Sequence, residues 1–313
     1  MKMLSKIEYK CKFDGTMQPA MCQPAEGDSP RPLMVSLHTW SFTFEANCAM
    51  YTEVASEYNW HMIFPHFRGE NWKPEACGSD MVISDLEDAV AYMKQNYNVD
   101  PKRIYLVGGS GGGHCSLLMA ARRPDLWTAV SAWCPISDVA LWHKQSCARK
   151  NVYANHISNA CGGDPALSAH ALHEARLRSP LTWLPNAAGT VTVDISTGIH
   201  DGHTGSVPIG QAVRAFNALA AEEDRISEED IAYMEENQKV PEHLAAKESD
   251  PAFGKYTVYL RRQSNRARLT LFEGGHDILP AVSAEWLERQ VSGEAPDWKP
   301  GKAINSTAAE LSR

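Results

Sequence analysis

The sequence predicts an α/β fold, with a mostly parallel, twisted sheet that carries helices on both faces. Short apolar runs, typical of buried strands, alternate along the chain with amphipathic helical patterns. One of these runs, Ile104–Val107, breaks into a glycine-rich turn and then into a helical pattern that reaches Arg123. Alternating strands and helices favour parallel sheets, because each connecting helix packs on a face of the sheet. With 313 residues, 43% of them hydrophobic, the chain can bury a large core as one domain, 1–313.

The first part of the chain predicts a hairpin and two buried strands. Residues 5–22 alternate in polarity around an Asp14-Gly15 turn, which indicates an antiparallel pair. A Pro- and Gly-containing loop separates this hairpin from the core. The expected elements that follow are a strand at 33–37, a helix at 46–58 and a strand at 61–64.

The middle of the chain predicts the central helices and a partial lid. Val82, Leu86, Ala89, Val90 and Met93 form one apolar stripe along a helix at 79–97. A strand is expected at 129–133. Residues 135–185 are polar and interrupted by Pro and Gly, with helical pieces at 137–150 and 166–177, which suits a segment lying over the active-site face.

The last part of the chain predicts two strands separated by an acidic insert. Strands are expected at 190–195 and 267–272, with a helix at 211–219 and another through Trp286. The insert, 222–264, is expected to be helical, with Ser227 as an N-cap. It could serve as a subunit contact in a homo-oligomer, as a lid, or as a solvated decoration, and we favour the last. The tail, 292–313, is expected to be irregular.

The turn after the central strand predicts a nucleophilic serine. Gly108-Gly109-Ser110-Gly111-Gly112 matches the pattern G-x-S-x-G between a strand and a helix. Glycines are needed on both sides of Ser110, because a sharp turn leaves no room for Cβ atoms. The same string would also suit an ordinary strand-to-helix turn or a phosphate loop. The flanking strand and helix favour the nucleophile.

Two later loops supply candidates for a base and a carboxylate. A serine hydroxyl needs an imidazole base, and the imidazole needs a carboxylate that orients it. His276 follows the last strand and Asp201 follows the strand at 190–195, so both lie beyond the carboxyl ends of strands. Asp194 lies inside a strand and Asp277 adjoins the base, so Asp201 is the better candidate, with a loop-capping aspartate as its alternative.

The pocket around these residues can be predicted only in part. The amide of Gly111 and that of Thr39 or Trp40 are expected to bind an oxyanion. Aromatic side chains near the site stack on sugars or aryl groups, although core packing explains any single tryptophan better. Arg68 could hold a substrate carboxylate or form a structural ion pair. The candidate substrate-binding residues are His38, Phe42, Arg68, Trp72, Trp142 and His143.

Composition and charge exclude several classes of function. A formal net charge of −8 argues against nucleic acid or an anionic membrane as a partner. No apolar run reaches the length of a spanning helix, and the N-terminus carries no signal segment, so the expected location is cytoplasmic. The eight cysteines have no zinc-ligand spacing, so neither a metal nor a cofactor is expected.

Taken together, the motifs resemble those of the α/β-hydrolases, and specifically the catalytic domain of the prolyl oligopeptidase family and its single-domain esterase relatives. The resemblance implies Ser110, Asp201 and His276 as the catalytic triad. It rests on short motifs in order from about residue 33 to 280: Phe67-Arg68-Gly69, Gly78 with Asp85, Val99 to Ile104, Gly108 to Gly113, Gly163-Asp164-Pro165, Ser179-Pro180-Leu181, Gly198 to Asp201 with Val207-Pro208, and Gly274-Gly275-His276.

Two departures from the family pattern favour an esterase over a peptidase. Only some 30 residues precede the first core strand, where the family's peptidases carry a propeller, and no tyrosine stands at His38-Thr39. The expected substrate is a small-molecule or oligosaccharide ester with an acetyl, hydroxycinnamoyl or aryl group. The alternatives are a peptidase acting on short peptides and a non-catalytic binding protein of the same fold.

Overall fold

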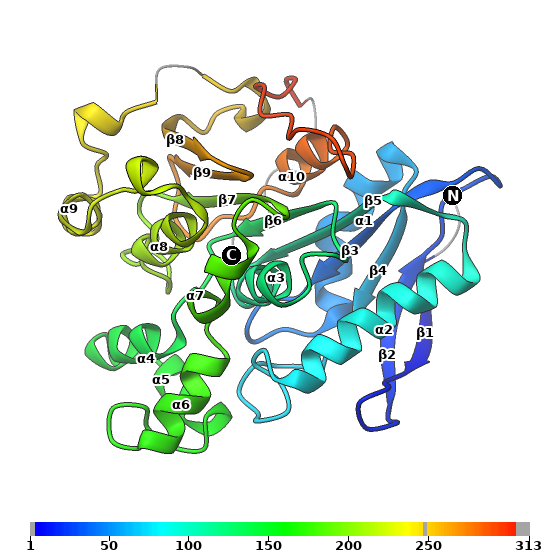
Figure 1. Ribbon diagram of the computed structural model, residues 1–313, viewed down its shortest axis with the longest axis horizontal. Coiled ribbons are helices and arrows are strands. Elements are labelled where there is room, and N and C mark those ends of the chain that lie inside the picture. The colour runs from blue at the N-terminus through cyan, green and yellow to red at the C-terminus, as the bar shows by residue number, and fades with distance from the viewer. Residues whose placement is uncertain (1–3, 247–248, 305–313) are drawn as a thin grey trace.

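The computed structural model describes residues 4–246 and 249–304, and within them the strands form one nine-stranded sheet. Its order is β1-β2-β4-β3-β5-β6-β7-β9-β8 (Figure 1). The six strands from β4 to β9 in this order pair in parallel, while the β1–β2 hairpin and β8 add antiparallel strands at the two edges. The predicted mostly parallel sheet of an α/β-hydrolase is confirmed.

The strands lie close to their predicted positions. The central strand is longer than expected, since it begins at Val99 and ends at Gly109, directly before Ser110. The strands are β1 (Ser5–Lys10), β2 (Met17–Gln23), β3 (Arg31–Leu37), β4 (His61–Pro65), β5 (Val99–Gly109), β6 (Ala129–Trp133), β7 (Thr192–Gly198), β8 (Val258–Ser264) and β9 (Ala267–Phe272).

Helices cover both faces of the sheet, because successive strand residues point to opposite sides. On one face, Leu33, Val35 and their neighbours pack against α2, α3 and α8. On the other face, Met34 and Tyr105 pack against α1 and α10. These helices are α1 (Phe44–Tyr58), α2 (Asp80–Asn96), α3 (Gly111–Arg122), α8 (Gly210–Leu219) and α10 (Pro280–Leu287).

The segment predicted as a partial lid folds as a group of short helices. Figure 1 shows α4 (Val139–Ala148), α5 (Tyr153–Ala160) and α6 (Ala169–Leu177) gathered together at one side of the sheet. They form their own apolar cluster, which includes Trp142 and Ile157 and reaches Trp40 in the loop after β3. The segment returns to the sheet through α7 (Pro180–Trp183) and a short 3-10 turn.

The insert, 222–264, differs from its prediction at its end. Ser227 does cap a helix, α9 (Glu228–Asn237), and its hydroxyl accepts a hydrogen bond from the Asp230 amide. However, residues 258–264 form β8, an antiparallel edge strand on β9, and not part of a helical insert. The sequence here, three apolar residues followed by four polar ones, has no strand periodicity, and its pairing with β9 decides its conformation.

The remaining residues add little to the position of the site. Residues 292–304 of the predicted irregular tail form neither helix nor strand, although Trp298 stacks on Trp286; residues 305–313 lie outside the described part of the chain. No helix among the described residues has the length and apolar character needed to cross a bilayer. All eight cysteines are free thiols, and Cys147 is the exposed one.

Candidate active site

Ser110 occupies a sharp turn between β5 and α3. Its φ angle is +56°, a left-handed conformation that is unfavourable for a residue with a side chain. The Ser110 amide donates a 2.8 Å hydrogen bond to the carbonyl of Trp133 at the end of β6. A Cβ atom on Gly108 would lie 2.4 Å from the Gly112 carbonyl, and one on Gly112 would lie 2.4 Å from the Leu37 oxygen. Only glycine fits on both sides of the serine.

Asp201 and His276 meet from two neighbouring strand ends. The loop after β7 carries Asp201, and the loop after β9 carries His276. Nδ1 of His276 lies 2.7 Å from a carboxylate oxygen of Asp201, whose side chain is fully buried. The other carboxylate oxygen accepts hydrogen bonds from the amides of Gly202 and Val207. The carboxylate is therefore held rigidly and fixes the orientation of the imidazole.

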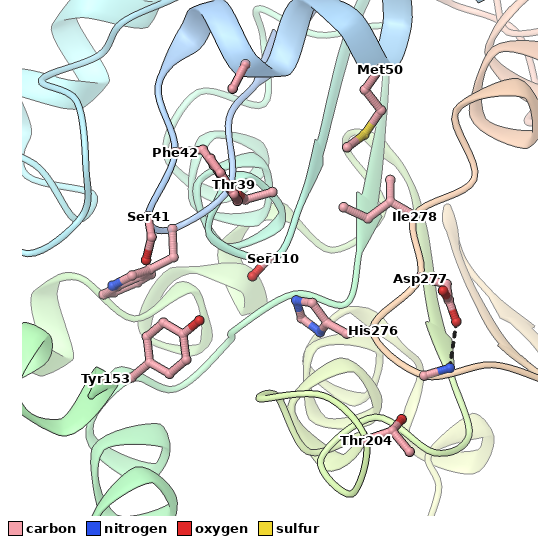
Figure 2. Close-up of a pocket in the computed structure, with 13 residues that line it drawn as sticks. Thr39, Ser41, Phe42, Met50, Ser110, Tyr153, Thr204, His276, Asp277 and Ile278 are labelled. Carbon is pink, nitrogen blue, oxygen red and sulfur yellow. Dashed lines mark hydrogen bonds between the residues drawn. The ribbon is translucent and has the colours of Figure 1, made fainter. Parts of the chain in front are cut away.

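Ser110 and His276 lie side by side in one pocket. Figure 2 shows the Ser110 hydroxyl beside the imidazole ring, and both residues line the pocket. Because Nδ1 is bonded to Asp201, it is Nε2 of His276 that remains for the hydroxyl. No hydrogen bond joins these two described side chains. Serine–histidine contacts are often loose without substrate and shorten when it binds.

The environment of His276 favours its protonated form. Burial alone would lower the pKa of the imidazole, but the charge of Asp201, the hydrogen bond to Asp201 and the nearby Cys134 outweigh that effect. The net result raises the pKa of His276 well above its ordinary value. An imidazole in this position readily accepts a proton from a hydroxyl.

Two backbone amides, those of Gly111 and Trp40, are candidates for binding an oxyanion. Gly111 is the first residue of α3, so its amide has no acceptor within the helix. A Cβ atom on Gly111 would lie 2.5 Å from the backbone nitrogen of Trp40, which shows how closely the loop after β3 approaches the turn. Of the two sequence candidates, Thr39 and Trp40, the Trp40 amide is thus the one beside Gly111.

The pocket has a volume of about 600 Å³, within the range of small-molecule sites. Besides Ser110, Trp40 and His276, its apolar wall consists of Phe42, Ala46, Met50 and Ile278. Its polar wall consists of Thr39, Ser41, Tyr153, Thr204, Gly275 and Asp277. The carboxylate of Asp277 already accepts a hydrogen bond from the Gly275 amide.

Tyr153 is a pocket residue that the sequence did not indicate. It begins α5, and its ring packs against Trp142 and His156, with centroid distances of 5.0 and 5.8 Å. Figure 2 shows its hydroxyl directed into the pocket on the side of Ser110. The hydroxyl makes no hydrogen bond to the described part of the chain. Nothing in the local sequence separates this tyrosine from an ordinary helical residue, so no sequence signal was available.

Arg68 does not line this pocket, which corrects its prediction as a substrate-binding residue. Its guanidinium donates to both carboxylate oxygens of Asp85, at 2.7 and 2.8 Å, and to Asp14 in the turn of the β1–β2 hairpin. Arg68 therefore forms the structural ion pair that was the alternative, and it connects the hairpin to α2.

Four further candidates do not line this pocket, and for the three buried ones, His38, Trp142 and His143, the prediction that they contact substrate is likewise corrected. His38 is fully buried and hydrogen-bonds to the carbonyls of Thr39 and His66. Trp142 donates to the Ser206 carbonyl from within the α4–α6 cluster, as core packing requires. His143 is buried against Ser158, and the Trp72 ring packs on His156. Phe42, in contrast, lines the pocket and is 61% exposed.

Comparisons of the sequence with known proteins find hydrolases. The sequence model of the prolyl oligopeptidase family matches residues 66–237, more than half of the chain. An acetylxylan esterase of Coprinopsis cinerea is 42% identical over 48 residues, which cover 15% of this chain and 13% of that protein. The S-formylglutathione hydrolase of Mus musculus is 28% identical over 170 residues, which cover 45% of this chain and 59% of that protein. The match thus spans less than two thirds of either relative.

Several solved structures with a similar fold are peptidases. The acylaminoacyl peptidase of Pyrococcus horikoshii superposes on 96% of this chain with a TM-score of 0.63 and 13% identity, and 44% of that chain is covered. Oligopeptidase B of Leishmania major superposes on 91% of this chain with a TM-score of 0.58 and 16% identity, and 35% of that chain is covered. At these identities the likeness concerns the fold alone. With the fold, the serine turn and the sequence match all in agreement, the chain belongs to the prolyl oligopeptidase family, a family of α/β-hydrolase serine hydrolases.

Proposed function

We propose that the protein is a serine carboxylesterase that cleaves acyl esters through an acyl-enzyme on Ser110. The observation that carries this proposal is that Ser110 and His276 line one pocket, with His276 hydrogen-bonded to Asp201. The close approach of the Gly111 and Trp40 backbones beside Ser110 supports it. A nucleophile, an oriented base and two oxyanion donors are the parts that acyl transfer requires.

In the first half-reaction, Ser110 Oγ attacks the ester carbonyl while Nε2 of His276 takes the hydroxyl proton. The carbonyl oxygen becomes an oxyanion that accepts hydrogen bonds from the two amides. The tetrahedral intermediate collapses, the bond to the alcohol oxygen breaks, and His276 returns its proton to the leaving alcohol. Asp201 stays ionised and stabilises the imidazolium throughout.

In the second half-reaction, water attacks the acyl carbon and His276 accepts a proton from it. The second intermediate collapses, the acid leaves, and Ser110 recovers its proton from His276. The apolar wall of Phe42, Met50 and Ile278 suits the acyl group of an ester, such as an acetyl or aryl acyl group.

The preference for esters over peptides rests on the charges around the pocket. Asp277 is the one charged side chain in the wall besides the His276 imidazole, and its carboxylate is already engaged by the Gly275 amide. A peptidase that selects a charged peptide end needs an unengaged charge to bind it. The match to an acetylxylan esterase also supports an ester, whereas the family and its solved structures favour the alternative of a peptidase on short peptides.

The test compares p-nitrophenyl acetate with a chromogenic dipeptide amide, using wild type and Ser110→Ala. We expect ester turnover that the Ser110→Ala substitution abolishes, and slower or undetectable amide cleavage. Dominant amide cleavage would establish the peptidase instead. Inertness towards both substrates and towards an organophosphonate would establish a non-catalytic protein of the same fold. An acetylated xylooligosaccharide and a ferulate ester then separate carbohydrate acetyl esters from hydroxycinnamoyl esters.

A further inference from the structure

The buried thiol of Cys134 lies beside the Asp201–His276 pair, and acyl transfer does not require it. Cys134 directly follows β6, adopts a φ angle of +45° and is fully buried. Its Sγ lies 3.4 Å from the carbonyl oxygen of Asp277, to which it donates. The thiol thus lies close to the side chains of both His276 and Asp201.

Three metal-binding side chains meet at this place. Cys134, Asp201 and His276 each offer one ligand atom, and these atoms all lie within 4.8 Å of one another. They come from the ends of β6, β7 and β9, which are neighbours in the sheet. The hydroxyl of Thr197, 3.5 Å from a carboxylate oxygen of Asp201, is a further oxygen beside this group.

The combination of donors selects a particular class of cation. Thiolate, imidazole nitrogen and carboxylate oxygen are the ligands of Zn²⁺, and soft thiolate also favours Cd²⁺, whereas Mg²⁺ prefers oxygen and water. Zn²⁺ bonds of roughly 2.0–2.3 Å place neighbouring tetrahedral ligands about 3.3–3.8 Å apart. Small side-chain shifts would bring the three ligand atoms to that spacing.

We propose that Cys134, Asp201 and His276 form an inhibitory binding site for soft divalent cations such as Zn²⁺ and Cd²⁺. The cation binds the Cys134 thiolate, whose proton is released to solvent, and the Nδ1 lone pair of neutral His276, whose ring proton moves to Nε2. This breaks the hydrogen bond between His276 and Asp201 and leaves Nε2 without the lone pair that accepts the Ser110 proton. The imidazole then loses the orientation that makes it a base. The cation lies on the Nδ1 side of the ring, away from Ser110 and the pocket, so substrate still binds.

This position gives a kinetic signature. The effect on turnover rests on the proposed esterase function, whereas binding of the cation does not. We expect Zn²⁺ to lower kcat while KM changes little, with full recovery after a chelator is added. Mg²⁺ at the same concentration is expected to have no effect.

The inhibition test uses Cys147→Ala as its background, because this substitution removes the exposed thiol that could bind cations on its own. Adding Cys134→Ala is expected to weaken Zn²⁺ inhibition by roughly tenfold or more, since loss of even a supporting residue costs that much in metal affinity. Inhibition is measured relative to each variant's own metal-free rate. Cys134→Ser, which keeps the hydrogen-bond donor but removes the thiolate ligand, serves if the alanine variant does not fold. Equal inhibition with and without Cys134, or a raised KM with unchanged kcat, overturns the proposal.

A second measurement separates the cation site from the enzyme's activity. Cd²⁺ is titrated into Ser110→Ala/Cys147→Ala, and the ultraviolet charge-transfer band of a cadmium–thiolate bond is recorded. We expect one equivalent of Cd²⁺ to produce the band, and Cys134→Ala to abolish it. A band that survives loss of Cys134 overturns the site, even in an active esterase. A Cys134-dependent band in a protein inert towards every ester keeps the site and rejects the proposed function.

Discussion

The Arg68–Asp85 and His276–Asp201 pairs are alike in most of what can be measured about them. Each sets a fully buried carboxylate 2.7 Å from a nitrogen of its basic partner, and each basic residue lies in the loop after a strand of the same sheet. The sequence proposed Arg68 and His276 alike as site residues. The basic side chains are 9% and 24% exposed, so neither is free in solvent.

The two pairs differ in whether the basic residue has a hydrogen-bonding atom left to contact substrate. The guanidinium of Arg68 donates to Asp85, Asp14 and Cys11, so its capacity serves the fold. His276 uses Nδ1 for Asp201, and its ring lines the pocket beside Ser110. In this protein, a polar group that faces the pocket with a donor or acceptor to spare marks the site, and a buried charge alone does not.

The largest effect is expected from the residues that face the pocket. Ser110→Ala and His276→Ala should each lower kcat/KM by roughly 10⁴-fold or more, and the double variant should be no worse, because the triad acts as a unit. The measurement is p-nitrophenyl acetate hydrolysis, with thermal unfolding as the control for folding. A His276→Ala enzyme that keeps most of its rate would remove this residue from the site.

Replacing the carboxylate of Asp201 should lower the rate and change its dependence on pH. Asp201→Asn is expected to lower kcat by roughly 10⁴-fold, because the imidazole loses its correct tautomer. In wild type, His276 must be neutral to act as a base, so kcat/KM should rise with pH through a pKa above 6.5 and be lost below it. Since the Asp201 charge helps raise the pKa of His276, the midpoint should move to lower pH in the variant. An unchanged midpoint contradicts this assignment.

Breaking the Arg68–Asp85 pair should lower the stability of the protein without lowering its rate of catalysis. Arg68→Met leaves the buried Asp85 carboxylate without its partner, which is expected to lower the free energy of unfolding by about 3–5 kcal/mol. Urea unfolding measures this loss, and kcat of the folded variant should not change. Arg68→Met/Asp85→Leu should recover part of the loss, because no buried charge remains. A fall in kcat without loss of stability would place Arg68 in the site after all.

The smallest effect is expected from Tyr153, another polar residue that faces the pocket. Tyr153→Phe removes a hydroxyl with no partner in the described chain, so stability should hold while substrate loses one hydrogen bond. A neutral hydrogen bond contributes about 0.5–1.5 kcal/mol, which corresponds to a roughly 2- to 10-fold fall in kcat/KM. Tyr233→Phe on α9, where the ring is exposed, is the matched control. Equal kinetics for both variants would show that the Tyr153 hydroxyl does not contact substrate.

Sequence position already ranked the candidate partners of His276, and the tertiary structure shows where the other two aspartates bind instead. Sequence position favoured Asp201 over Asp194 and Asp277, and the contacts agree with that order. Asp194 is paired with Arg268 at 2.7 Å inside the sheet, and Asp277 binds the Gly275 amide in its own turn. These partners of Asp194 and Asp277, one distant along the chain and one within a turn, are what the local sequence did not show.

What the sequence determined by itself was local. Apolar runs and helical stripes placed the core strands and helices, and the glycines around Ser110 predicted the turn, because backbone sterics act between near neighbours. The tertiary structure decided which side chains meet. It turned residues 258–264 into an edge strand, committed Arg68 to Asp85, buried Trp142 and brought Tyr153 to the pocket. These outcomes depend on contacts between segments far apart in the chain, where packing and charge pairing act, and no local pattern records them.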